Sequence, residues 1–340
     1  MSPPSFHSPK HVALRLVSII VSLASAITFL WAFLALSVSF PIPVLRWPVA
    51  LGLAGVAISS AIRLRHRPFG PALSFFTCAA PVFLWWLTLT PRNDRRWQPD
   101  MERTAWAEIS GDQITLHNFR NTDRRTSDDF TPRWETRIFH LSALKKLDFF
   151  MVYWGSPHIC HTMITFDFGT EGRVCASIEA RREQSESYSP LAGAFRQYEL
   201  IYVLGDERDL VRLRADLHAA TDQVYLFRIP ATPEVAQAIF LDYLQSTNRL
   251  HAQPDWYHSL TTNCSTLIRE HVNKAHVYER WDWRIIANGH LDKLLYAQGY
   301  LDRSLPLPEL KARSLINPAA QASGNAPDFS DRIRAGLPRF

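Results

Sequence analysis

The first 91 residues most constrain what this chain can fold into, because they contain three long apolar runs and no Asp or Glu. The runs cover residues 16–40, 44–62 and 68–90. Crossing a bilayer core of about 30 Å takes roughly 20 residues of apolar helix. The second run is short and includes Arg46, whose long side chain can reach the interface. Residues 1–91 are therefore predicted to form a membrane anchor of three transmembrane helices.

The basic residues of this segment predict its orientation. They gather before the first run and in the loop after the second run, namely Lys10, Arg15, Arg63, Arg65 and Arg67. Because short cytoplasmic loops are enriched in Lys and Arg, both places are predicted to be cytoplasmic. Three crossings then put the rest of the chain on the outer side of the membrane. Loss of the short second span would reverse this orientation.

The net charge of +5 comes from the anchor rather than from a cationic surface. Six basic residues lie before residue 92, so the remaining 249 residues carry 31 basic and 32 acidic side chains. A nucleic-acid partner would require a basic patch or groove in the soluble part. No nucleic-acid binding is therefore predicted.

Residues 100–305 have the mixed pattern of an α+β domain. Strands are predicted at 105–109, 113–117, 138–141, 147–153, 161–168, 173–180, 198–204 and 224–229, and helices at 206–214 and 233–250. Gly169 and Gly172 lie between two of these strands and predict a hairpin. The polar, proline-bearing segment 306–340 is predicted to be a surface or disordered tail.

Cys264 is the candidate nucleophile among the four cysteines. Asn263 is a good helix N-cap and apolar residues follow it, which puts the Cys264 sulfur at a helix N-terminus. Unpaired amides and the helix dipole favour a thiolate there, and the amides are also candidate oxyanion donors. The alternative is an inert cysteine on the buried side of a helix. Cys78, in the third apolar run, is expected to be a small buried residue.

A thiol nucleophile needs a base, and His161 opens a strand from which an imidazole can face such a helix. A metal site is the alternative, since His158, Cys160 and His161 are crowded. Neighbouring strand residues point to opposite faces, so Cys160 and His161 do not readily share one ion, and no metal is predicted. A disulfide between Cys160 and Cys175 is not favoured, because the hairpin pairs Cys160 with about position 180.

Glu179 is the candidate for orienting the imidazole. An odd hairpin loop places Glu179 opposite His161 on the same face, and an even loop turns it to the other face. The alternative is a structural ion pair of Glu179 with Arg181. Tyr257 and Asn263 are the candidate substrate-binding residues, although Tyr257 could equally be a core aromatic.

Four segments together resemble one family, the Lnb N-terminal periplasmic domain. They are residues 153–162 (YWGSPHICHT), 177–188 (SIEARREQSESY) and 195–202 (FRQYELIY), and the Asn263-Cys264 pair. The similarity covers roughly residues 115–300. The order of His before Cys also resembles the permuted papain-like enzymes of the NlpC/P60 type, which implies a papain-like α+β domain.

The resemblance implies a membrane-anchored thiol acyltransferase of the bacterial inner membrane, with its domain in the periplasm and no cofactor. Its substrates would be membrane lipid and diacylated lipoproteins, with an acyl chain moving from the sn-2 position of the diacylglyceryl group to the N-terminal cysteine amine. The family's essential Cys and His map onto Cys264 and His161. This chain differs in having three N-terminal spans and none after the domain. The alternatives are a cell-wall peptidase or amidase of the NlpC/P60 type and a non-catalytic membrane protein.

Overall fold

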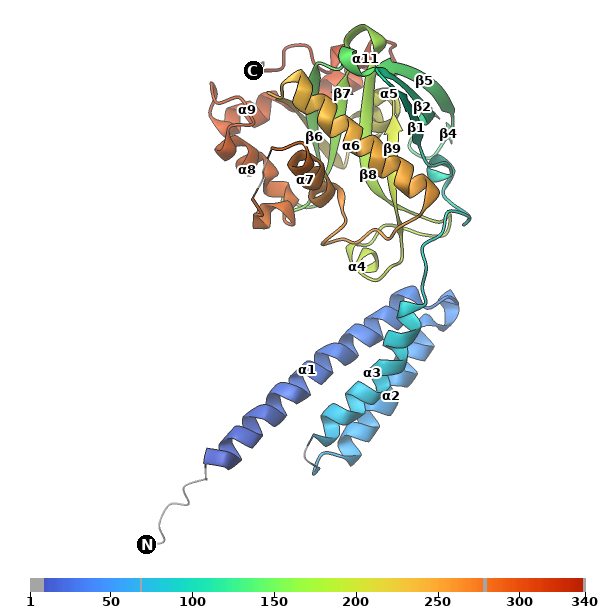
Figure 1. Ribbon diagram of the computed structural model, residues 1–340, viewed down its shortest axis with the longest axis vertical. Coiled ribbons are helices and arrows are strands. Elements are labelled where there is room, and N and C mark those ends of the chain that lie inside the picture. Colours follow the sequence, from blue (N-terminus) through green and yellow to red (C-terminus); the bar gives the residue numbers. More distant parts are fainter. Residues whose placement is uncertain (1–8, 68, 278–279, 339–340) are drawn as a thin grey trace. The chain divides into compact units, whose positions relative to one another are not determined.

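The computed structural model describes residues 9–67, 69–277 and 280–338, which divide into two compact units. One unit comprises Met1–Pro91 and Ser189–Gln197, and the other comprises Arg92–Tyr188 and Tyr198–Phe340. Each unit is described by itself below. The elements of the second unit form a mixed α+β domain (Figure 1).

The first unit is built from three long apolar helices, α1 (Pro9–Ser39), α2 (Arg46–Arg63) and α3 (Gly70–Leu87). Their candidate membrane spans are Ala13–Ser39, Pro43–Arg63 and Gly70–Leu87. The prediction of three transmembrane helices followed by an α+β domain is confirmed at this level. Pro68, where the third predicted run begins, lies outside the described residues.

The short segment Ser189–Gln197 packs with these helices. In the sequence, however, it lies between two parts of the other unit. It carries the short helix α4 (Pro190–Gly193). Phe195 is buried in the same apolar cluster as Ala32 and Ala79. The Arg196 guanidinium lies 3.6 Å from the ring centre of Trp86, so a cation–π contact adds to the apolar packing.

The second unit is organised around one eight-stranded sheet with the order β1-β2-β9-β8-β7-β6-β10, in which β5 also pairs with β2. The strands are β1 (Trp106–Ser110), β2 (Gln113–Arg120), β5 (Trp134–His140), β6 (Lys146–Trp154), β7 (Cys160–Asp167), β8 (Arg173–Arg181), β9 (Glu199–Gly205) and β10 (Asp222–Ile229). A small two-stranded sheet pairs β3 (Asp123–Arg124) with β4 (Phe130–Thr131). The strands predicted from the sequence are confirmed, with ends shifted by a few residues.

Helices cover both faces of the sheet. Helices α6 (Pro233–Ala252) and α7 (Cys264–Lys274) pack on one face and cross in front of the strands in Figure 1. Helices α5 (Glu207–Arg212), α10 (Asn317–Ser323) and α11 (Phe329–Arg332) close the core on the other face. Two further helices follow α7, α8 (Leu291–Gln298) and α9 (Leu307–Arg313).

The segment after residue 305 is not the surface or disordered tail that the sequence predicted. It forms α9, α10 and α11, and Ile316, Phe329 and Ile333 are buried in the core with Val152 and Met163. The apolar residues here are few and widely spaced, so no continuous pattern marks them in the sequence. These residues become buried only because they pack against a face of the sheet that is formed by residues distant in the sequence.

Candidate functional site

The site lies where strands β7 and β8 separate. Their pairing ends at Met163 and Ser177. Strand β7 nevertheless continues to Cys160 along β6, and β8 continues to Arg181 along β9. The side chains that the sequence selected on β7 and β8, together with the first residue of α7, come together at this opening.

Helix α7 begins at Cys264 because Asn263 caps it. The Asn263 side chain accepts hydrogen bonds from the amides of Ser265 (3.0 Å) and Thr266 (3.1 Å), and the Thr266 side chain accepts from the Asn263 amide. The side-chain amide of Asn263 also donates, through Nδ2, to the carbonyl of Ser259 (2.7 Å). These bonds give Asn263 a capping role. Its contact with substrate stays a prediction.

The predicted base lies beside the thiol. His161 and Thr162 both interact with the Cys264 side chain and favour its thiolate form. Burial alone would raise the pKa of the Cys264 thiol, but the hydrogen bond and charge of His161, together with Thr162, lower that pKa to about 7. A thiol with such a pKa is partly ionised at neutral pH, as a nucleophile requires.

A short polar chain continues from the imidazole to Glu179. His161 Nε2 lies 2.7 Å from Ser177 Oγ, and Ser177 Oγ lies 2.7 Å from Glu179 Oε1. The direct distance from His161 Nε2 to Glu179 Oε1 is 4.0 Å. Glu179 therefore lies on the same face of the sheet as His161, as a hairpin loop with an odd number of residues requires. Its effect on the imidazole passes through Ser177, a residue that the sequence did not single out.

The chain of hydrogen bonds also assigns the proton on the imidazole. Although burial opposes ionisation of Glu179, His161 and Arg120 lower the pKa of this carboxyl to about 2, so it can only accept hydrogen bonds. Ser177 must donate its single proton to Glu179 and accept from Nε2 of His161. This leaves Nδ1 of neutral His161 as the nitrogen that can take a proton from the thiol.

The structural alternative for Glu179, an ion pair with Arg181, does not form. The Arg181 guanidinium instead donates to the carbonyls of Met101 (2.9 Å) and Glu102 (2.6 Å) and to the side chain of Asn93 (2.8 Å). Arg181 thereby binds the segment that precedes β1 instead of Glu179.

Asn288 is a second site residue that sequence reasoning missed. Its Oδ1 accepts from the backbone amide of Cys160 (2.8 Å), and its Nδ2 donates to Ser265 Oγ (2.7 Å) and lies 3.9 Å from Cys264 Sγ. The next residue must be glycine, because a Cβ at Gly289 would lie 2.4 Å from the carbonyl oxygen of Pro157. The Asn-Gly pair predicts a turn from the sequence. The neighbouring residues give no sign that this turn lies close to Cys264.

Tyr257 lies next to the site but is buried rather than presented to solvent. Its hydroxyl is 3.3 Å from that of Tyr188, and its backbone amide donates to the carbonyl of Tyr198 (3.0 Å). Burial raises the pKa of Tyr257, and the charge of Cys264 raises it further. Tyr257 thus packs as a core aromatic beside the sulfur, and a role in substrate binding stays a prediction.

All four cysteines are free, and Cys160 and Cys175 are both buried. Within the described ranges, no group of three or more His, Cys, Asp or Glu side chains is placed to hold a metal ion. His158 and His290 form a close pair, with Nδ1 and Nε2 2.9 Å apart.

A protein-family model matches part of the chain. Residues 130–289, a little under half of the chain, match the family model described as the Lnb N-terminal periplasmic domain. The family recognised from the sequence is confirmed for this segment. No curated protein and no solved structure is similar enough to the chain to match it. With the three candidate spans, the match supports a membrane protein that has an extracytoplasmic domain.

Proposed function

From the match of residues 130–289 to the Lnb N-terminal periplasmic domain, we propose that this chain is a membrane-anchored thiol acyltransferase. It moves an acyl chain from the diacylglyceryl group of a bacterial lipoprotein to the amine of the lipoprotein's N-terminal cysteine. Residues 1–91 anchor it in the inner membrane with the N-terminus in the cytoplasm, and residues 100–305 form the enzyme domain in the periplasm. The observation that carries the proposal is the hydrogen-bonded chain from Glu179 to a thiol whose pKa is lowered to about 7.

The first half-reaction transfers the acyl group to sulfur. His161 Nδ1 takes the proton of Cys264, and the thiolate attacks the carbonyl carbon of the sn-2 ester. A sulfur–carbon bond forms as the ester carbon–oxygen bond breaks, and the imidazolium returns its proton to the leaving alkoxide. The Glu179 carboxylate stabilises the imidazolium through Ser177, which raises the population of the reactive ion pair.

The second half-reaction passes the acyl group to nitrogen. The neutral α-amine of the lipoprotein attacks the thioester carbon, its proton goes to His161 Nδ1, and the carbon–sulfur bond breaks to restore the thiolate. Water must be excluded at this stage, or the thioester is hydrolysed. Cys264 is only 6% exposed, which supports a site that limits access of water.

Two donors are placed to stabilise the oxyanion of each tetrahedral intermediate. The amides of Ser265 and Thr266 are engaged by Asn263, whereas the Cys264 amide has no acceptor within the described part of the chain. The second donor is Asn288 Nδ2, at 3.9 Å from the sulfur. We therefore assign oxyanion stabilisation to the Cys264 amide, which lies at the start of α7 as the sequence predicted, and to Asn288.

The test is the mass spectrum of N-terminal lipopeptides from cells that express the wild type, Cys264→Ser or His161→Ala. We expect N-acylated, lyso-glyceryl termini in the wild type and diacylglyceryl termini in both variants. Cys78→Ala and His140→Ala are the matched controls, since Cys78 lies in α3 and His140 is an exposed partner of Glu171. Identical termini in every strain would overturn the proposal. A change in muropeptides instead would identify a cell-wall peptidase, and no change in either would favour a non-catalytic membrane protein.

A further inference from the structure

An apolar cavity of about 240 Å³ begins beside the candidate nucleophile. Its floor is one face of the sheet, formed by Leu147 and Phe149 of β6, Ile164 of β7 and Ile229 of β10. These residues share a face because Leu147 pairs with Ile229 and Phe149 pairs with Ile164. Side chains from α6, α7 and α8 form the walls.

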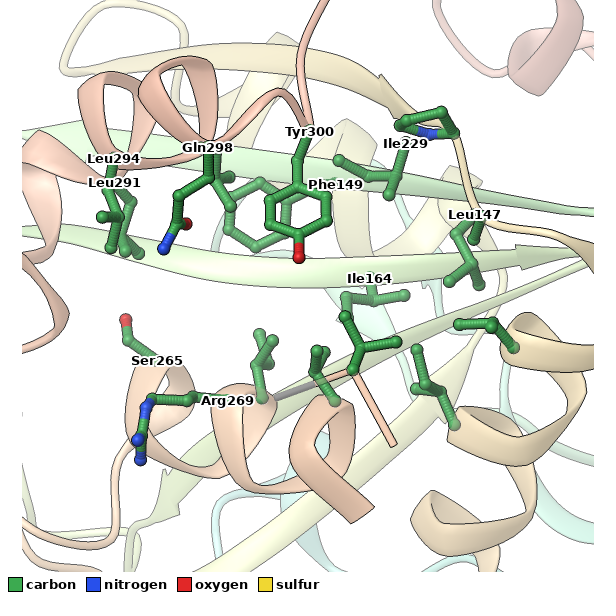
Figure 2. Close-up of a pocket in the computed structure, with 18 of the residues that line it drawn as sticks. Leu147, Phe149, Ile164, Ile229, Ser265, Arg269, Leu291, Leu294, Gln298 and Tyr300 are labelled. Carbon is green, nitrogen blue, oxygen red and sulfur yellow. The ribbon is translucent and has the colours of Figure 1, made fainter. Parts of the chain in front are cut away.

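The cavity runs along α7 away from the site. Ser265, Ile268 and Val272 line it at helical spacing, so one stripe of the helix faces the cavity. At 1.5 Å per residue, Ser265 and Val272 are about 10 Å apart along the helix axis. Figure 2 shows Ser265 at one end of the cavity and Leu147 and Ile229 at the other, with Ile164 nearer to them.

The end of the cavity near the first turn of α7 is polar, and its lining residue Ser265 lies next to the reacting sulfur. Ser265 Oγ accepts from Asn288 and lies 3.8 Å from Cys264 Sγ. The cavity therefore joins a polar, hydrogen-bonding end at the nucleophile to an apolar body. A ligand that matches it has one reactive polar group at the end of an apolar chain.

We propose that this cavity binds the acyl chain that Cys264 accepts, with the acyl carbon at the sulfur and the hydrocarbon lying along α7 toward Leu147. This deepens the proposed function and rests on it for the covalent step. A peptide does not fit the same space, because its backbone groups would be buried against mostly apolar walls without hydrogen-bond partners. The cavity thus favours an acyl substrate over a cell-wall peptide.

The first measurement is the rate at which Cys264 of the full chain in lipid nanodiscs is acylated by p-nitrophenyl esters of 4, 8, 12 or 16 carbons. The thiolate forms a bond to the ester carbon, p-nitrophenolate leaves, and intact mass shows the acyl-enzyme. Each methylene that enters the cavity is expected to raise the rate, by up to roughly fourfold, until the cavity is full. Nanodiscs are used because detergent tails would compete for the cavity.

A matched pair of variants tests the location. Val272→Trp fills the cavity from α7, and Glu270→Trp adds the same side chain to the same helix at an exposed position. We expect the ratio of the 16-carbon to the 4-carbon rate to fall at least tenfold in Val272→Trp and to keep its wild-type value in Glu270→Trp. An unchanged ratio in a folded Val272→Trp, with a raised unfolding temperature, would make the cavity a mere packing defect. Leu294→Ala, which enlarges the cavity, is the second variant and is expected to shift the optimum to longer chains.

A second measurement does not depend on catalysis. Hexadecanoic acid carrying a diazirine on its chain is photocrosslinked to the Cys264→Ala chain in nanodiscs, and the labelled peptides are mapped. Crosslinks in residues 146–154 and 264–274 that disappear with Val272→Trp are expected. If they form but no ester acylates the wild type, the proposed function fails and the cavity assignment stands. If acylation occurs without dependence on chain length and these peptides stay unlabelled, the cavity assignment fails alone.

Discussion

Two buried polar clusters that both include residues of β7 differ in the groups with which their carboxylates interact. At the open end of β7 and β8, the Glu179 carboxylate reaches Cys264 through Ser177 and His161. Four residues along β7 from His161, Thr165 donates to Glu207, whose carboxylate forms two further bonds of 2.7 Å with Arg334.

In the second cluster the negative charges of the carboxylates are paired with a positively charged guanidinium. Arg334 also binds Asp148 (2.7 Å), and the side chains of Arg334, Glu207 and Asp148 are all at most 6% exposed. The first cluster instead ends on groups that change their protonation, a thiol and an imidazole. One buried carboxylate is thus paired with a guanidinium, whereas the other is joined through a hydroxyl and an imidazole to a thiol.

The largest effect is expected from His161→Ala, which removes the base. Acyl transfer should fall by about a thousandfold or more, since both half-reactions use this imidazole. The fold should persist, because the Arg334 cluster is untouched. The check is single-turnover acylation together with urea unfolding of the purified chain, and retention of a tenth of the wild-type rate would contradict the assigned role.

Arg334→Ala should break the ion pairs of the second cluster without changing the acyl-transfer chemistry. Two carboxylates would be left buried without their counter-ion, which costs about 3–5 kcal/mol of unfolding free energy. The measurement is the urea-unfolding transition of the sheet domain. Arg332→Ala is the matched control, because Arg332 ends α11 two residues before Arg334 and forms an exposed ion pair with Asp328. Equal stabilities of the two variants would show that the cluster does not hold α11 in place.

Ser177→Ala should give a smaller effect, because it removes the link between Glu179 and the imidazole but leaves both groups. A loss of roughly 10- to 100-fold in the rate is expected, corresponding to about 1–3 kcal/mol. A structural role alone would not move the pH profile, whereas loss of this positioning contact should shift its midpoint upward. Ser177→Thr keeps the hydroxyl and should restore much of the rate. Wild-type kinetics in the alanine variant would remove Ser177 from the site.

The smallest effect concerns the pH dependence of Cys264 alkylation. The reactive thiolate forms as pH rises through the pKa of about 7, so the rate with iodoacetamide should be half-maximal there and level off above it. Glu179→Gln removes the negative charge that favours the imidazolium, so the thiol should hold its proton to higher pH. The midpoint is expected to move up by about one unit. A downward or absent shift would show that Glu179 is electrostatically separate from the thiol.

Several features of the site were predictable because they depend on neighbours in the sequence. The cap at Asn263 and the start of α7 follow from residue types within one helical turn. The placement of Glu179 on the face of His161 depended on a single undecided quantity, the parity of the loop. Phe168 to Gly172 make that loop five residues long, and Gly172 has a φ of 104°, a conformation that favours glycine.

The sequence by itself determined the three apolar spans, the α+β pattern, the strands that carry the candidate base and the capped helix that carries the candidate nucleophile. Only the tertiary structure decided that Ser177 stands between His161 and Glu179, that Asn288 approaches Cys264, that Phe329 enters the core, and that a cavity lies along α7. The physical reason is the distance along the sequence over which each kind of interaction acts. Periodicity and capping act over a few residues, whereas the contacts of His161 with Ser177 and of Asn288 with Cys264 join residues 16 and 24 positions apart. Such contacts exist only once the sheet has brought the elements together.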